Sequence, residues 1–282
     1  MRRLAAVLVF LAACGGNESR PVQPGLPTLT LASPQAGGEF GRAVAFVGDL
    51  VAVGAPDRNR VHVYLGASGR LLRTLHGSGR FGAALAANGN ELFVGAPQDG
   101  RVDVYDAVTG ERLRILRSGG GDAFGAAVAV SGAEVWVGAP TRHSGAGEVV
   151  RFAWPSAVKI GAVASPHAVP GGAFGASLAE SSGLFAVGAP GEGRVYRMQG
   201  GAVVETLKGG TGFGSSVAVG AGLTLVGSPV EGKAFVYGGG APRVLVATVP
   251  RFGLGVALDG THAVVAGAAY GGRALVFDAF SG

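Results

Sequence analysis

The stretch Phe40–Pro56, FGRAVAFVGDLVAVGAP, decides the fold of this chain. It begins with Phe-Gly, continues through two short apolar runs separated by Gly48-Asp49, and ends with Gly-Ala-Pro. Two apolar runs joined by a two-residue turn of this kind predict a β-hairpin. Because Pro cannot donate a hydrogen bond to a sheet, the closing Pro predicts the end of the second strand.

The same pattern is repeated along the chain. The Phe-Gly pairs are Phe40-Gly41, Phe81-Gly82, Phe124-Gly125, Phe174-Gly175, Phe213-Gly214 and Phe252-Gly253. The steps between successive Phe residues are 41, 43, 50, 39 and 39 residues. The closing triplet becomes Gly-Ser-Pro in the fifth copy and degenerates to Ala-Gly-Ala-Ala at 266–269 in the sixth. A period of about 40 residues with several strands in each unit predicts a propeller or a solenoid.

Six in-phase copies of Phe-Gly followed by Gly-Ala-Pro resemble the FG-GAP repeat of the integrin α-subunit propeller, from Phe40 to the C-terminus. The resemblance implies a β-propeller. We therefore expect an all-β fold of six four-stranded blades. The integrin propeller has seven, and a degenerate seventh blade within Thr141–Gly172 is the alternative. That insert is only about ten residues longer than its neighbours, which favours elongated loops.

Each repeat is expected to supply four strands, near 43–47, 50–54, 60–65 and 70–75 in the first copy. The first strand is rich in small residues, which suits the crowded centre of a propeller. The fourth alternates charged and apolar residues, which protects an outer edge. We interpret the Phe rings as wedges between blades and the Gly residues as points of close backbone approach, so both are structural.

A strand-like segment precedes the first repeat. Residues 28–32, TLTLA, alternate polar and apolar side chains. The sixth repeat ends at 278–282, at the turn where its fourth strand should begin. We expect 28–32 to pair beside 274–277 and to close the ring, because closure removes an open sheet edge.

The N-terminus has the pattern of an export signal. Arg2 and Arg3 precede the apolar run 4–13, which is too short to span a bilayer. The run ends in Leu-Ala-Ala-Cys-Gly, which resembles the lipobox of bacterial lipoproteins and implies lipidation of Cys14. An ordinary signal peptide with a chance cysteine is the alternative. We expect a signal peptide at 1–13, a lipidated flexible tether at 14–25 and the propeller at 26–282.

These features predict a bacterial cell-envelope protein attached to a membrane by its lipid, with the outer membrane as the default because Gly15 is not Asp. Cys14 is the single cysteine, so no intrachain disulfide can form. The formal charge of +5 becomes +3 without Arg2 and Arg3. So small a charge on an exported chain gives no reason to expect a nucleic-acid partner.

Neither a metal-binding motif nor a catalytic motif stands out in the sequence. Many FG-GAP propellers carry a calcium loop between the first two strands. Here the corresponding turns are short and offer too few oxygen ligands for Ca²⁺, so we expect neither metal nor cofactor. The five histidines do not have metal-ligand spacing. The turn carboxylates Asp49, Glu91, Glu134 and Asp259 belong to different blades.

One polar feature recurs at the start of the third strand, on the end of the blades that carries Gly-Ala-Pro. Local pairing of each cation at a strand end is the favoured interpretation, and a ring of cations that binds an anionic partner is the alternative that would make these residues a binding site. Neighbouring loops add further candidates, and Glu148 is the exception in the ring. The candidate ligand-binding residues are Arg58, Arg60, Arg101, Arg142, His143, Arg194, Lys233, Tyr270 and Arg273.

We therefore expect a monomeric, non-catalytic adhesion-type propeller that presents its loops to a protein or an anionic glycan. The alternative is an envelope assembly scaffold that docks other membrane proteins. A third hypothesis is a hydrolase or lyase with a site at the axis. The small residues of the innermost strands offer few groups for such chemistry.

Overall fold

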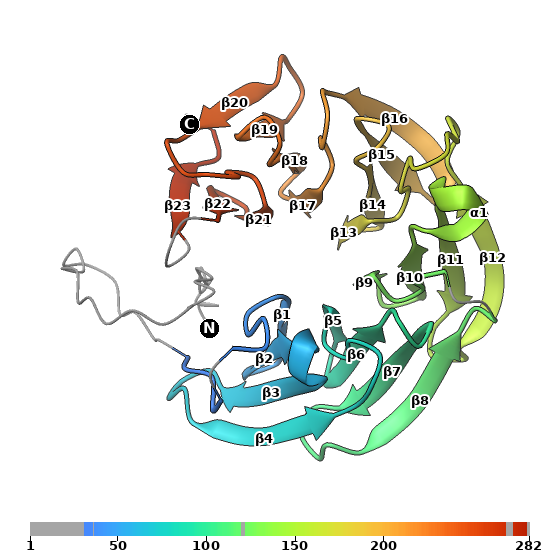
Figure 1. Cartoon of the computed structure of the whole chain (residues 1–282), viewed down its shortest axis with the longest axis vertical. Helices are drawn as coiled ribbons and strands as arrows, with labels where there is room; N and C mark the ends of the chain where they lie inside the picture. Colours follow the sequence, from blue (N-terminus) through green and yellow to red (C-terminus); the bar gives the residue numbers. More distant parts are fainter. Residues whose placement is uncertain (1–30, 36, 120–121, 269–272, 281–282) are drawn as a thin grey trace.

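A computed structural model of the protein describes residues 31–35, 37–119, 122–268 and 273–280. Its strands form six antiparallel sheets arranged as the blades of a β-propeller (Figure 1). Blades one to five have four strands each, and blade six has three among the described residues. No helix in the described part of the chain is long and apolar enough to cross a bilayer.

The strands follow one another from the centre of the disc to its rim. Blade one comprises β1 (Val44–Val47), β2 (Leu50–Ala55), β3 (Arg60–Leu65) and β4 (Leu71–His76), and blade two comprises β5 (Ala84–Asn88), β6 (Glu91–Ala96), β7 (Arg101–Asp106) and β8 (Arg112–Arg117). Blade three comprises β9 (Ala127–Val130), β10 (Glu134–Ala139), β11 (Glu148–Ala153) and β12 (Val158–Ala164), and blade four comprises β13 (Ser177–Ser181), β14 (Leu184–Ala189), β15 (Arg194–Gln199) and β16 (Ala202–Lys208). Blade five comprises β17 (Ser216–Gly220), β18 (Leu223–Ser228), β19 (Lys233–Tyr237) and β20 (Arg243–Val246), and blade six comprises β21 (Gly255–Asp259), β22 (His262–Gly267) and β23 (Arg273–Asp278).

This arrangement confirms the predicted roles of the strands. The small-residue strands β1, β5, β9, β13, β17 and β21 surround the centre, and β4, β8, β12, β16 and β20 lie at the rim (Figure 1). The four strands expected in the first repeat are present within a residue or so at their ends.

The insert in blade three lengthens two loops and adds no blade. Helix α1 (Arg142–Gly145) lies in the connection between β10 and β11, and residues 165–176 connect β12 to β13. Gly147 and Phe174 join these two loops through an isolated parallel bridge. The six observed blades therefore support loop elongation over the seventh-blade alternative.

The Phe-Gly and Gly-Ala-Pro motifs meet at the same end of each blade. In blade one the Gly41 N–H donates to the Gly54 carbonyl at 2.9 Å, and in blade two the Gly82 N–H donates to Gly95 at 3.0 Å. The same bond recurs in the other four blades, with Ala266 accepting in blade six. The second residue of each Phe-Gly pair has φ between 86° and 96°, which is why it must be glycine.

The same glycines also set the spacing between blades. A Cβ built on Gly54 would lie 2.1 Å from the carbonyl oxygen of Gly82 in the next blade. The equivalent distance is 2.0 Å for Gly95 against Gly125, and it is equally short at the next three junctions. Because real Cβ atoms do not approach an oxygen this closely, any side chain at these positions would push two blades apart.

The Phe rings fill the space beside these contacts. Phe81, Phe124, Phe174, Phe213 and Phe252 are all fully buried. Each ring also meets an aromatic side chain of the third strand of its own blade, as in Phe81 and Tyr105, whose centroids are 5.9 Å apart at 77°. Such edge-on pairs are favourable beyond the area that they bury. The five Phe rings therefore take part in the packing of the core.

Hydrophobic clusters join five pairs of neighbouring blades. Each contains buried residues of two successive blades, from blades one and two to blades five and six. A sixth cluster holds Val51, Val53 and Tyr64 of blade one with Leu31, Phe40 and Val44, and it includes no residue of blade six. We call the space between blades six and one, within the described residues, the seam.

The predicted closing strand would lie at this seam, beside the last strand of blade six. Residues 28–30 lie outside the described residues, so pairing of 28–32 with 274–277 stays a prediction. Of that segment, Leu31 packs on blade one and Ala32 accepts a hydrogen bond from the Tyr64 hydroxyl at 2.9 Å.

The glycine contacts predict a specific sensitivity to one added methyl group. Gly95→Ala should lower the free energy of unfolding by about 1–3 kcal/mol, because the new Cβ overlaps the Gly125 carbonyl oxygen. Gly240→Ala is the control, since nothing lies within 4 Å of its Cβ position, and it should change stability by less than about 0.5 kcal/mol. Urea denaturation of both variants tests this, and equal effects would contradict it.

Candidate binding face

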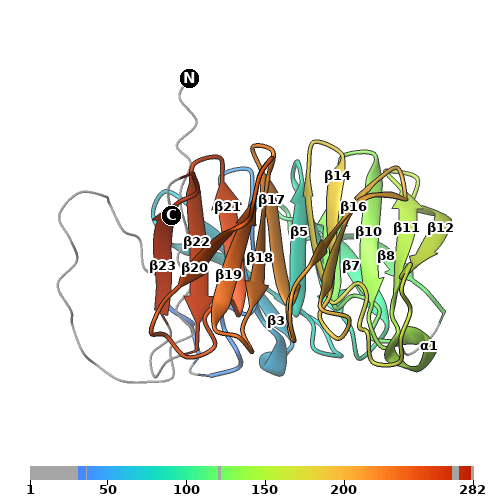
Figure 2. The ribbon, with the colours of Figure 1, turned by 90° about the horizontal axis from the view of Figure 1, so that it is seen from above.

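The turns between second and third strands, and the connections between blades, lie on one side of the disc, which we call the Gly-Ala-Pro face. It also carries the 3₁₀ helix η1 (Pro56–Arg58) and helix α1, and α1 is visible at the lower edge of Figure 2. The hairpin turns lie on the opposite side, which we call the hairpin face. The predicted ligand residues that are described all belong to the Gly-Ala-Pro face, and Tyr270 lies outside the described residues.

Arg101 is the most firmly held cation of this face. Its Nη1 lies 2.7 Å from Asp99 Oδ2, its Nε donates to Asp103 Oδ2 at 2.9 Å, and its Nη2 donates to Ser78 Oγ at 3.1 Å. Burial alone would lower the pKa of Arg101, but the bond to Asp103 and the two negative charges outweigh it and raise the pKa. Arg101 is therefore a permanently charged residue that holds two loops together.

The same local pairing is repeated in two other blades. An acidic residue stands two positions before the cation in Asp99-Gly100-Arg101, Glu192-Gly193-Arg194 and Glu231-Gly232-Lys233. The nitrogen–oxygen separations are 4.0 Å for Arg194 and Glu192 and 3.7 Å for Lys233 and Glu231. The sequence contains this signal as an acid-Gly-base triplet, whose acidic residue the periodicity of the cations alone does not reveal.

In blade three the cation precedes the acidic residue in the sequence, and the two side chains are again paired. Its exceptional Glu148 accepts from Arg142 Nη1 at 2.8 Å, and Arg142 also pairs with Asp122 and Ser118. Hydrogen bonds and charges of Glu148 and Asp122 outweigh burial and raise the pKa of Arg142. His143 Nε2 lies 3.4 Å from the same Glu148 carboxylate, with its side chain 64% exposed.

The remaining predicted residues belong to blades one and six. Arg60 Nη1 donates to Gln35 Oε1 at 2.6 Å. Arg58 ends η1, and Arg273 begins β23 at an exposed position. In the same region Arg80 bridges Glu39 and Asp57, which connects blades one and two. The described face is thus a mosaic of fixed positive and negative groups.

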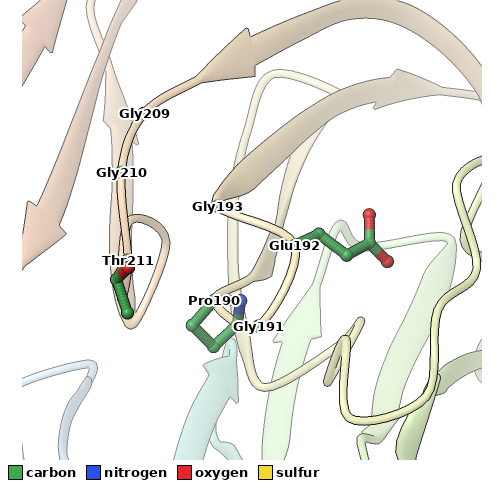
Figure 3. Close-up of a pocket in the computed structure, with 7 residues that line it drawn as sticks. All are labelled: Pro190, Gly191, Glu192, Gly193, Gly209, Gly210 and Thr211. Atoms are coloured by element: carbon green, nitrogen blue, oxygen red, sulfur yellow. The ribbon is translucent and has the colours of Figure 1, made fainter.

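A recess of 330 Å³ opens on this face between the loops of blade four. Pro190, Gly191, Glu192, Gly193, Gly209, Gly210 and Thr211 line it. Figure 3 shows the Glu192 carboxylate pointing away from Gly209 and Gly210. That side chain is fully buried, and its Oε2 accepts from the Tyr196 hydroxyl at 2.5 Å. The recess is therefore walled by backbone and by the Pro190 and Thr211 side chains. It lies at the small end of the range of ligand pockets, which begins at about 300 Å³.

Two carboxylates of the hairpin turns, Glu91 and Glu134, have structural partners across or within blades. Glu91 accepts from Trp154 Nε1 at 2.7 Å across the junction of blades two and three. Glu134 accepts from Trp136 Nε1 and Arg151 Nη2, each at 2.8 Å. Within the described ranges, no group of three or more His, Cys, Asp or Glu side chains is placed to hold a metal ion. The expectation that the protein needs no metal or cofactor stays a prediction.

His62 is a buried histidine on the side of blade one that faces the seam. The residue is 2% exposed, its Nδ1 lies 2.9 Å from Thr74 Oγ1, and its ring centroid is 5.7 Å from that of Phe40. Burial lowers the pKa of His62, and the positive charges of Arg60 and His76 lower it further. The fold therefore favours the neutral imidazole.

Comparison with known proteins finds a solved structure with a similar fold. No family model matches the sequence, and no curated protein matches it. Among solved structures, a virginiamycin B lyase from Staphylococcus aureus is similar with a TM-score of 0.68 at 10% sequence identity. The alignment covers 83% of this chain and 78% of that one. At this identity the likeness shows a shared propeller fold alone.

The pairing of Arg101 predicts unequal effects of removing two ring cations. Arg101→Gln should cost about 3 kcal/mol of stability, because Asp103, only 1% exposed, would lose its nearest counter-charge. Lys233→Gln should cost less than about 1 kcal/mol, since that side chain is 43% exposed. Urea denaturation of both variants is the measurement, and similar losses would show that Arg101 is not structural.

The depressed pKa of His62 predicts acid sensitivity with a definite sign. As pH falls, the unfolded chain binds a proton near the ordinary pKa of 6.5 before the folded chain does. The stability from neutral His62 is thus complete above about pH 6.5 and falls below it, by at most about 1.4 kcal/mol per pH unit.

Denaturation of wild type and His62→Gln between pH 5 and 8 tests this, with His262→Gln, whose side chain is 50% exposed, as control. The His62 variant should show a shallower loss in acid than the control. Parallel pH profiles for all three proteins would refute the expectation.

Proposed function

We propose that the protein is a non-catalytic recognition propeller whose Gly-Ala-Pro face binds a protein partner. The observation that carries this proposal is that four cations of that face lie beside carboxylates, namely Arg101, Arg142, Arg194 and Lys233. Paired charges produce a weak long-range field and therefore attract polyanions poorly. A mosaic of fixed donors and acceptors instead suits the polar rim of a protein–protein interface.

The resemblance to FG-GAP propellers supports the same proposal, because it implies adhesion or recognition. The N-terminal pattern around Cys14 supports export and lipid anchoring in a bacterial envelope. On this proposal the propeller is a rigid disc that presents its loops from a membrane surface.

Site-specific photo-cross-linking tests which face binds. A photoreactive residue at His143, with 64% of its side chain exposed, or at Val230, 69% exposed, probes the Gly-Ala-Pro face. Matched probes at Val108 and Phe280, 50% and 54% exposed, report on the hairpin face. We expect discrete protein adducts in envelope extract from the first pair and none from the second.

Two outcomes would overturn this proposal. Adducts from the hairpin face alone would place the binding surface on the wrong side. Binding of an acidic polysaccharide that weakens steeply with added salt would favour the anionic glycan over the protein partner.

A lyase is the second candidate, because the similar solved structure is named a virginiamycin B lyase. The purified chain should be incubated with virginiamycin B and its loss followed by mass spectrometry. We expect no turnover above a heat-denatured control. Turnover would replace the recognition proposal with an enzymatic one.

A further inference from the structure

The seam lacks the glycine contact that the other five blade junctions share. At those junctions a glycine of one blade touches the Phe-Gly carbonyl of the next. In blade six Ala266 takes the glycine position, as its bond from the Gly253 N–H shows. A Cβ is therefore present where the carbonyl of Gly41 would have to approach. Blades six and one cannot meet through the contact used elsewhere, so other side chains must fill their junction.

The side of the seam formed by blade one already carries a substitute for a neighbouring outermost strand. At the first junction, Leu75 of β4 packs against Phe81, Leu92, Val94 and Tyr105 of blade two. The residues one repeat earlier are Phe40, Val51, Val53 and Tyr64, and Leu31 packs against the cluster of Val51, Val53 and Tyr64. Leu31 thus takes the place that an outermost-strand leucine of blade six would occupy.

The side formed by blade six is left uncovered. Strand β23 is an edge of its sheet, because the order of described strands ends there. Val276 of β23 is 50% exposed, whereas Val63 and Val104 at the same position of blades one and two are fully buried. In blade one the partner of Val63 is Arg73 of the outermost strand β4. An equivalent strand beside β23 would cover Val276.

We propose that the seam is a strand-docking site and that its occupant is the chain's own segment 28–31. The register follows from blade one, where Val61 pairs with Leu75 and Val63 with Arg73. Aligning Leu31 with Leu75 places Leu31 opposite Ala274 and Leu29 opposite Val276. Both leucines then face the seam, and Thr28 and Thr30 face the other way. Chain length supports this occupant, because Leu31 is already in position and Leu29 is two residues away.

Docking in this register fixes where the preceding chain leaves the disc. Strand β4 runs toward the Gly-Ala-Pro face, as its end at His76 beside the Asn59 loop shows. A docked segment runs the same way, so residues before 28 leave from the hairpin face. If the recognition proposal also holds, the tether and the binding face are on opposite sides, and the binding face points away from the anchoring membrane.

Engineered disulfides test the docking in the full-length chain. Cys14→Ser leaves introduced cysteines as the only thiols. Leu29→Cys with Val276→Cys should form an intramolecular cross-link on mild oxidation. The control pairs Leu29→Cys with Val244→Cys, because Val244 is 49% exposed on the outermost strand of blade five and should remain unlinked. Non-reducing electrophoresis and mass spectrometry of peptides report both outcomes.

A second pair of variants tests the direction of the segment. Leu31→Cys should link to Ala274→Cys and not to Asp278→Cys, because Ala274 lies at the Gly-Ala-Pro end of β23. Linkage to position 278 instead would show that the segment runs in the opposite direction. The tether would then leave the disc from the Gly-Ala-Pro face. Absence of any specific link would overturn the docking. A link between two chains would make a second copy the occupant, which also overturns it. All these outcomes are independent of whether a partner binds.

Discussion

The propeller depends on a contact between backbones in which no side chain takes part. At five junctions the glycine that ends one hairpin lies against the carbonyl of the Phe-Gly pair in the next blade. The same Phe-Gly amide is bonded to the hairpin of its own blade. Each motif therefore connects two blades at once, and the Phe ring seals the space around the contact. This constraint explains why Phe, Gly, Gly, Ala and Pro recur together while the strands between them vary.

The junction that departs from this rule is also the one where the two ends of the fold meet. Ala266 prevents the glycine contact there, and Val276 of β23 remains half exposed. Leu31 shows that the chain before the first repeat contributes to this junction. A ring closed by a docked segment, rather than by a sixth glycine contact, would couple the position of the N-terminal chain to the integrity of the disc.

The repeat allowed most of the fold to be predicted, because the Phe-Gly spacing sets the number of blades and the hairpin turns set the strands. The candidate site was predicted less completely. Cations at the start of each third strand were found from periodicity, but their partners were not. Asp99 was visible two residues before Arg101, whereas the pair of Arg142 and Asp122 needs two loops brought together by the fold. Charge along a sequence does not say which charges remain unpaired.

Native-state hydrogen exchange measured by NMR tests most directly whether the glycine contacts hold the blades together. The amides of Gly82, Gly125, Gly175, Gly214 and Gly253 are buried and bonded to carbonyls of their own blades. We predict that all five exchange only through global unfolding, with one opening free energy equal to that from denaturation. If any of them exchanged through a local opening of much lower free energy, the blades would be held by other contacts and the glycine constraint would be secondary.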